Sequence, residues 1–184
     1  MGIGAIGNYS YNNYYQGVNK ASSGQSFATS MNTSTHITLK MTDEDTGDKA
    51  LTCVGFPNGG SASVYKADNY SEANPQYRVK YWDNKGEERE YFVDPRKVNP
   101  SNTSYVEMLA YSTYADIQGG TNDAFGKFLT AAEGVNVDRK YDSSNIDTKM
   151  DFKPLVKEFM EMQYNAKNLQ GYLSYKQLYD YMDR

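Results

Sequence analysis

One acidic segment is the first candidate for a metal site in this sequence. The segment from Asp43 to Asp48 (DEDTGD) holds four carboxylates in six residues, and such hard oxygen ligands suit calcium. Their spacing differs from that of a twelve-residue calcium loop, and Gly47 is what a plain hairpin turn needs. His36 is the only histidine, so a histidine-based site is not expected. We expect no metal ion and no other cofactor.

The single cysteine, Cys53, excludes an internal disulfide and a CxxC zinc pair. It lies in the apolar run from Leu51 to Phe56, which predicts a small buried hydrophobic residue. A thiol nucleophile would be the alternative, and it would need His36 as its base.

Other catalytic patterns are also weak. There is no G-x-S-x-G sequence for a nucleophilic serine. Gly2, Gly4 and Gly7 form a G-x-G-x-x-G string, but no strand is predicted before it, as a dinucleotide site requires. When Gly171 is placed at the sixth position of an EF-hand loop, no carboxylate falls on a ligand position. The sequence favours a protein that is not an enzyme.

A charged hairpin is the clearest local feature. The stretch 76–82 alternates, the turn Asp83-Asn84-Lys85-Gly86 follows, and 87–94 alternates again. Glu88 and Glu90 share one face, as Arg78 and Lys80 do on the facing strand. Cross-strand ion pairs explain these four charges without any chemistry.

The same face of the hairpin carries two large aromatic side chains. An aromatic residue ringed by charges is typical of an interface anchor. We therefore predict a candidate binding surface for a protein partner, consisting of Arg78, Lys80, Trp82 and Phe92. In the alternative interpretation, the C-terminal helices cover this face and make Trp82 a core residue.

The first 34 residues differ from the rest of the chain. They are rich in Gly, Asn, Ser and Tyr and hold one charged side chain, Lys20. Such a segment buries too little apolar surface to offset its ordering entropy, so we predict a flexible, protease-sensitive tail. Segments of this composition can order against a partner. The candidate tail contacts are Tyr9, Tyr11, Tyr14 and Tyr15.

Residues 35–100 read as strands joined by turns. The alternation predicts an antiparallel sheet of about five strands with one solvated face. Their expected ranges are His36–Met41, Ala50–Phe56, Ser61–Ala67, Gln76–Trp82 and Glu87–Asp94.

Residues 101–184 read as about four helices. Ser104 and Glu107 form a capping box that begins the first helix, and Gly119-Gly120 ends it. The others are expected over Asn122–Glu133, from Asp151 to near Gly171, and from Ser174 onward. Strands followed by helices indicate an α+β fold, and we expect 35–184 to form one domain.

The stretches 93–100 and 104–120 together carry a sequence motif. Its matching residues are Asn99, Pro100, Glu107, Met108, Leu109, Ala110, Tyr114 and Asp116. It resembles a motif in short proteins of clostridial-type Gram-positive bacteria, a family described as a domain of unknown function. The resemblance implies a bacterial origin and a strand-to-helix junction, and it carries no activity.

Composition narrows the choice of partners. The net charge is −4 and no dense basic cluster is present, so nucleic acid is not expected. Neither an apolar run of about 18 residues nor a signal peptide is evident. We expect a soluble, cytoplasmic protein, with non-classical export left open.

Tyrosine is the compositional outlier, with 18 copies, and it suits wet interfaces. We therefore expect a non-enzymatic interaction protein that binds a protein partner or forms a homo-oligomer. The alternatives are a small-ligand or carbohydrate binder that stacks sugars on Trp82 and nearby tyrosines, or an enzyme whose site is dispersed in the sequence.

Overall fold

Consecutive strands form an antiparallel sheet in the computed structural model, which describes residues 49–135 and 145–184. The strands are β1 (Thr52–Gly55), β2 (Ser61–Lys66), β3 (Tyr77–Trp82) and β4 (Glu88–Val93). Each pairs with the next, in the order β1-β2-β3-β4. The described part of the chain thus holds four strands, not about five, because the expected strand His36–Met41 lies outside it.

The strands alternate between a buried and a partly exposed face, as predicted. Tyr77, Val79 and Tyr81 on β3 are fully buried, while the residues between them are only partly covered. Their partners on β2 include Ala62 and Val64, which are buried as well. One face of the sheet therefore forms part of the core, and we call the opposite face the outer face.

The predicted β3–β4 hairpin is confirmed, together with its turn. The Asp83 side chain accepts hydrogen bonds from the backbone N–H groups of Lys85 (2.8 Å) and Glu87 (2.9 Å). Gly86 has a φ of 83°, a conformation that glycine adopts without strain. The turn chemistry and the strand alternation together set the register of this hairpin.

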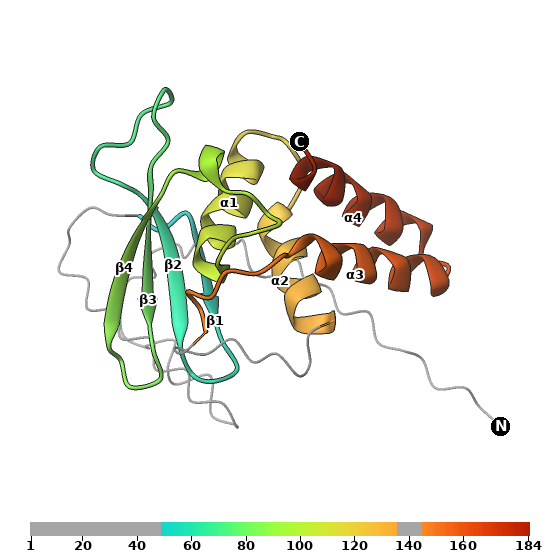
Figure 1. The fold of residues 1–184 in the computed structure, drawn as a ribbon, viewed down its shortest axis with the longest axis horizontal. Helices are drawn as coiled ribbons and strands as arrows, with labels where there is room; N and C mark the ends of the chain where they lie inside the picture. The colour runs from blue at the N-terminus through green and yellow to red at the C-terminus, as the bar shows by residue number, and fades with distance from the viewer. Residues whose placement is uncertain (1–48, 136–144) are drawn as a thin grey trace, which may run out of the picture. The chain divides into compact units, whose positions relative to one another are not determined.

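The helices lie on the inner side of the sheet, which confirms the α+β fold (Figure 1). In the described residues they are α1 (Tyr105–Ile117), α2 (Ala124–Val135), α3 (Lys153–Asn165) and α4 (Leu169–Met182), after a short 3-10 helix, η2 (Pro95–Lys97). Helix α1 packs on β2, β3 and β4. Helix α2 packs on α1 and α3, and α3 and α4 form a helical hairpin.

Helix α1 begins at the predicted capping box. The Ser104 hydroxyl accepts from the Glu107 N–H (3.3 Å), and the Glu107 carboxylate accepts from the Ser104 N–H (2.8 Å). The same carboxylate accepts from the Thr103 hydroxyl at 2.7 Å and pairs with Lys149. Reciprocal bonds of this kind satisfy the free N–H groups of the first helical turn.

The predicted boundary between α3 and α4 is wrong. The chain turns at Lys167, which has a φ of 60°, and Asn168 caps α4 by accepting from the Gly171 N–H at 3.0 Å. A Cβ on Gly171 would lie 2.6 Å from the Asn168 amide nitrogen. Gly171 therefore makes room for the cap and does not end α3, and Ser174 lies inside α4. Asparagine is a strong N-cap residue.

The start of α3 is also shifted relative to the prediction. Asp151 was expected to cap this helix directly, whereas the helix begins at Lys153 after the cap position Phe152. The Asp151 side chain still accepts a hydrogen bond from the Lys153 N–H, at 3.0 Å. Asp151 thus still bonds to the first turn of α3, but it does so from the position before the N-cap residue.

A chain of aromatic rings joins the strands to the helices in one core. Tyr105 of α1 lies at the centre, with its ring 5.6 Å from Phe56 and 5.2 Å from Phe128. Phe128 of α2 lies 5.4 Å from Phe152, which precedes α3. These side chains are buried, and edge-on ring contacts add to the energy of their burial.

Substitutions at adjacent β3 positions test which face of the sheet is the core. We expect Tyr81→Ala to destabilise the protein by about 3 to 5 kcal/mol, because a large buried side chain leaves a cavity. Trp82→Ala should cost only about 1 kcal/mol, because the indole lies on the outer face and retains solvent contact. Urea unfolding of both variants measures the difference. A larger loss for Trp82→Ala would reverse the assignment of the two faces.

The capping box predicts a dependence of stability on pH. Burial would raise the pKa of Glu107, but hydrogen bonds from Lys149, Ser104 and Thr103 hold it at about 2. A carboxyl group whose pKa falls on folding stabilises the native state above its unfolded pKa and loses that contribution as pH falls. Between about pH 4.5 and pH 2 we expect a loss of about 2 kcal/mol, allowing for partial exposure. Glu107→Gln should flatten this part of the urea-unfolding pH profile, and an unchanged slope would contradict the assignment.

Candidate functional site

The predicted surface residues Arg78, Lys80, Trp82 and Phe92 all lie on the outer face of the β3–β4 hairpin. In the register, Arg78 lies opposite Phe92, and Lys80 lies opposite Glu90. The four described helices lie on the other side of the sheet (Figure 1). They do not cover Trp82, as the alternative interpretation required.

The two aromatic residues of this surface do not form a pair. Trp82 lies opposite Glu88, whereas Phe92 lies opposite Arg78. Four residues along a strand, at about 3.3 Å each, separate these rows by about 13 Å. The sequence showed that the two aromatics share a face, and the register shows that a charged row lies between them.

Trp82 belongs to a network of hydrogen bonds and ion pairs at one end of the face. Its indole N–H donates to Glu88 Oε2 at 2.9 Å. Lys80 Nζ lies 3.3 Å from Glu88 and 3.5 Å from Glu90. Burial would lower the pKa of Lys80, but the two carboxylates raise it. The predicted cross-strand ion pairing is confirmed for Lys80, Glu88 and Glu90, whereas Arg78 lies opposite Phe92.

Phe92 lies at the other end of the face. It belongs to a cross-strand row in which a cationic side chain lies between two aromatic side chains. Its side chain is 62% exposed. Arg78 lies between Phe92 and Tyr65, which are its partners on β4 and β2. The Arg78 guanidinium carbon is 5.5 Å from the centre of the Tyr65 ring, a cation–π distance. Sequence analysis missed Tyr65, because a long loop joins β2 to β3 and the pairing register of these two strands cannot be predicted across it.

Cys53 is exposed, so its predicted burial is wrong. It pairs with Ser63 on the outer face, whereas Thr52 points inward and its hydroxyl oxygen lies 2.7 Å from that of Thr113. Side chains alternate along even a short strand, and an apolar run does not show which side chains face outward. The described residues include no histidine that could act as a base for the thiol.

Several predicted features lie outside the described residues. They are His36, the acidic segment 43–48 and the tail tyrosines Tyr9, Tyr11, Tyr14 and Tyr15. Within 49–135 and 145–184, no group of three or more His, Cys, Asp or Glu side chains could hold a metal ion. No helix in those ranges is long and apolar enough to cross a membrane.

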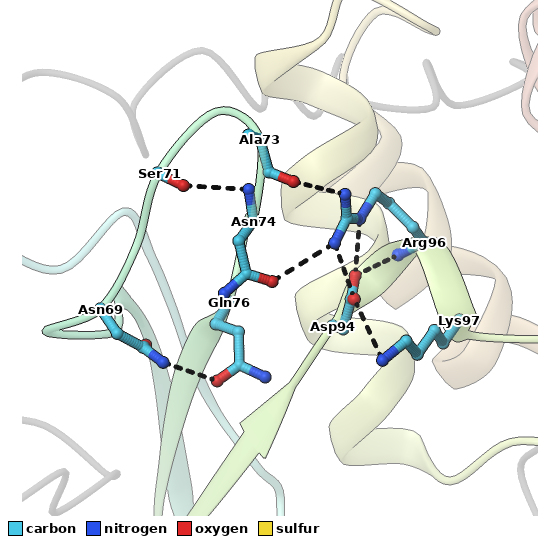
Figure 2. A network of polar contacts seen from close by, with 8 residues as sticks. All are labelled: Asn69, Ser71, Ala73, Asn74, Gln76, Asp94, Arg96 and Lys97. Atoms are coloured by element: carbon cyan, nitrogen blue, oxygen red, sulfur yellow. Dashed lines mark hydrogen bonds and ion pairs between the residues drawn. The ribbon is translucent and has the colours of Figure 1, made fainter.

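A polar clasp that sequence analysis missed joins the β2–β3 loop to η2 (Figure 2). Arg96 donates through Nε and Nη2 to the two carboxylate oxygens of Asp94, each at 2.9 Å. It also donates through Nη1 to the Ala73 carbonyl at 2.7 Å. The Asp94 side chain is only 6% exposed, and the Arg96 hydrogen bonds lower its pKa. These bonds engage the guanidinium, so we assign the clasp a structural role.

A second exposed apolar surface lies on the helical hairpin. Of the six large hydrophobic side chains that are exposed in the described residues, four belong to α3 and α4: Met162, Tyr164, Leu169 and Leu173. At the turn between these helices is an open hollow of about 420 Å³, lined by Tyr164, Asn165, Lys167 and Leu169. Sequence analysis missed this surface, because it placed the boundary between α3 and α4 at the wrong residues.

Comparisons of the chain with protein-family models, curated proteins and solved structures return no match. The resemblance to a clostridial-type family therefore stays a prediction from the residues of the first α-helix and the segment before it.

The clasp predicts a local change of dynamics in a variant. Arg96→Ala removes the bonds to Asp94 and Ala73, so amide exchange in 67–76 should accelerate about tenfold or more. Arg96→Lys keeps the charge but loses the two-pronged contact and should give an intermediate rate. Hydrogen–deuterium exchange with mass spectrometry measures both. Equal protection of the loop in all three proteins would show that the clasp does not hold it.

Proposed function

We propose that this protein is a non-enzymatic interaction protein that binds a protein partner through the outer face of its sheet. The observation that carries the proposal is the row formed by Tyr65, Arg78 and Phe92, in which Phe92 is 62% exposed. We place the protein in the bacterial cytoplasm, as the sequence analysis predicts.

The composition of this row supports the proposal. Aromatic residues and arginine are enriched at the centres of protein interfaces. Arg78 lies against the Tyr65 ring, so little side-chain entropy would be lost when it meets a partner. β4 is an edge strand of the described sheet, so a partner can reach Phe92 from the side as well as from the face.

A protein partner fits the face better than a carbohydrate does. Sugar binding would use the ring face of Trp82 as a stacking platform, but Trp82 is only partly exposed, and its indole N–H holds the Glu88 carboxylate beside the ring. The exposed aromatic residue of this face is Phe92, which carries no polar atom to orient a sugar.

Site-specific photo-crosslinking in cells tests the proposal. A benzoylphenylalanine at position 92 should capture one defined protein, whereas the same group at Lys85, in the β3–β4 turn, should not. Arg78→Glu should reduce the crosslinked product about tenfold, since charge reversal at an interface anchor costs on the order of 1 to 2 kcal/mol.

Two outcomes would contradict this function. Equal crosslinking from positions 92 and 85 would show that the face has no specific partner. Binding of purified protein to a glycan array, with loss of that binding in Trp82→Ala, would favour the carbohydrate class.

A further inference from the structure

Helix α4 presents an exposed stripe on the side that faces away from the core. Leu169 is 60% exposed and Leu173 is 51% exposed, and the exposed Lys176 and Asp180 continue the stripe. This spacing of four, three and four residues keeps the side chains on one face of a helix. Leu178, by contrast, is fully buried. α4 thus presents two exposed leucines toward solvent, in addition to the apolar side that it packs on the core.

The apolar surface continues around the turn of the hairpin. Tyr164 at the end of α3 is 63% exposed, and its ring lies 5.5 Å from that of Tyr172 on α4. Leu169 and Tyr164 both line the open hollow at the turn. Exposed apolar side chains that gather in this way mark an interaction site more often than isolated ones do.

Lys167, in the turn before α4, and Asp180, near the end of α4, carry opposite charges. Lys167, in the turn, precedes Leu173 by six residues, and Asp180 follows it by seven. Leu173 and Asp180 both lie within α4, so at about 1.5 Å per residue they are about 10 Å apart along its axis, whereas Lys167 lies two residues before the helix begins. Asp180 also pairs with Lys176, at 2.6 Å, within its own helix. That pair is solvent-exposed and contributes little to stability.

We propose that the partner of this face is a second copy of the same chain, packed antiparallel along α4. A two-fold axis near Leu173 brings the two Leu173 side chains together. It also places Lys167 of each copy beside Asp180 of the other. A two-fold interface joins one patch to itself, so the patch must be self-complementary. A central apolar residue with opposite charges toward the two ends of α4 meets that condition.

The interaction is independent of the proposed binding face on the sheet. The stripe lies on α4, whereas Phe92 lies on the outer face of β4, beyond α1, α2 and the sheet itself (Figure 1). The experiments below use no residue of the sheet, so their failure would leave that proposal untouched.

Sedimentation velocity of the full-length protein over about 10 μM to 1 mM, the range of weak dimers, tests the apolar contact. We expect a concentration-dependent dimer that Leu173→Lys weakens about tenfold or more. Ile117→Lys is the matched control, because Ile117 is 45% exposed on α1, and it should dimerise like the wild type. Circular dichroism confirms that both variants are folded.

A charge swap tests the orientation. Lys167→Glu and Asp180→Lys should each weaken self-association about tenfold, because each homodimer then holds two like-charge contacts. An equimolar mixture should recover wild-type association, since the mixed dimer restores both attractive contacts. Variants that dimerise like the wild type, a mixture without recovery, or a wild type that is monomeric at every concentration would overturn the proposal.

Discussion

The packing around Tyr105 is the contact on which the rest of the structure depends. This ring lies one residue after the cap of α1 and contacts Phe56 beyond β1, Phe128 on α2 and Phe152 before α3. The cap fixes where the helix begins, and the beginning of the helix fixes where the ring points. Three segments that are far apart in the sequence are therefore held together at one buried side chain.

The two ends of α1 extend this order to the neighbouring segments. At its start, the capping-box residue Glu107 pairs with Lys149, while Thr103 exchanges backbone hydrogen bonds with Met150. At its end, the Asp116 carboxylate accepts from the N–H groups of Ala124 and Phe125 and so caps α2. Burial raises the pKa of Asp116, although the bonds from α2 oppose this effect. A residue of the predicted family motif thus has a structural role.

Sequence reasoning succeeded where local chemistry determines the structure. The β3–β4 turn and the Ser104 cap each depend on side chains within a few residues of the backbone that they bond. It failed where contacts are distant or the signals compete. Gly171 resembled the end of α3, because the sequence alone does not show that Asn168 caps the beginning of α4. The exposure of Cys53 depends on which face of β1 meets α1.

The same limit explains why the candidate surface was only partly predicted. Alternation along one strand places Trp82 and Phe92 on one face, because side-chain parity is a local property. Their separation by the Lys80–Glu90 row, and the position of Tyr65 beside Arg78, depend on cross-strand register. Register is fixed by burial of the other face. The buried Tyr77, Val79 and Tyr81 thus determine which outer side chains become neighbours.

The two exposed surfaces follow from how the core is arranged. Within 49–135 and 145–184, a single sheet covered on one side leaves its other face without a layer, and that is where Phe92 lies. A terminal helical hairpin packs through one side of each helix, so the far side of α4 is also left without a neighbour among the described residues. Groups this far apart on a rigid core are expected to act additively. Occupation of one surface should therefore leave the affinity of the other nearly unchanged, so the protein could pair with its own copy and hold a different protein at once.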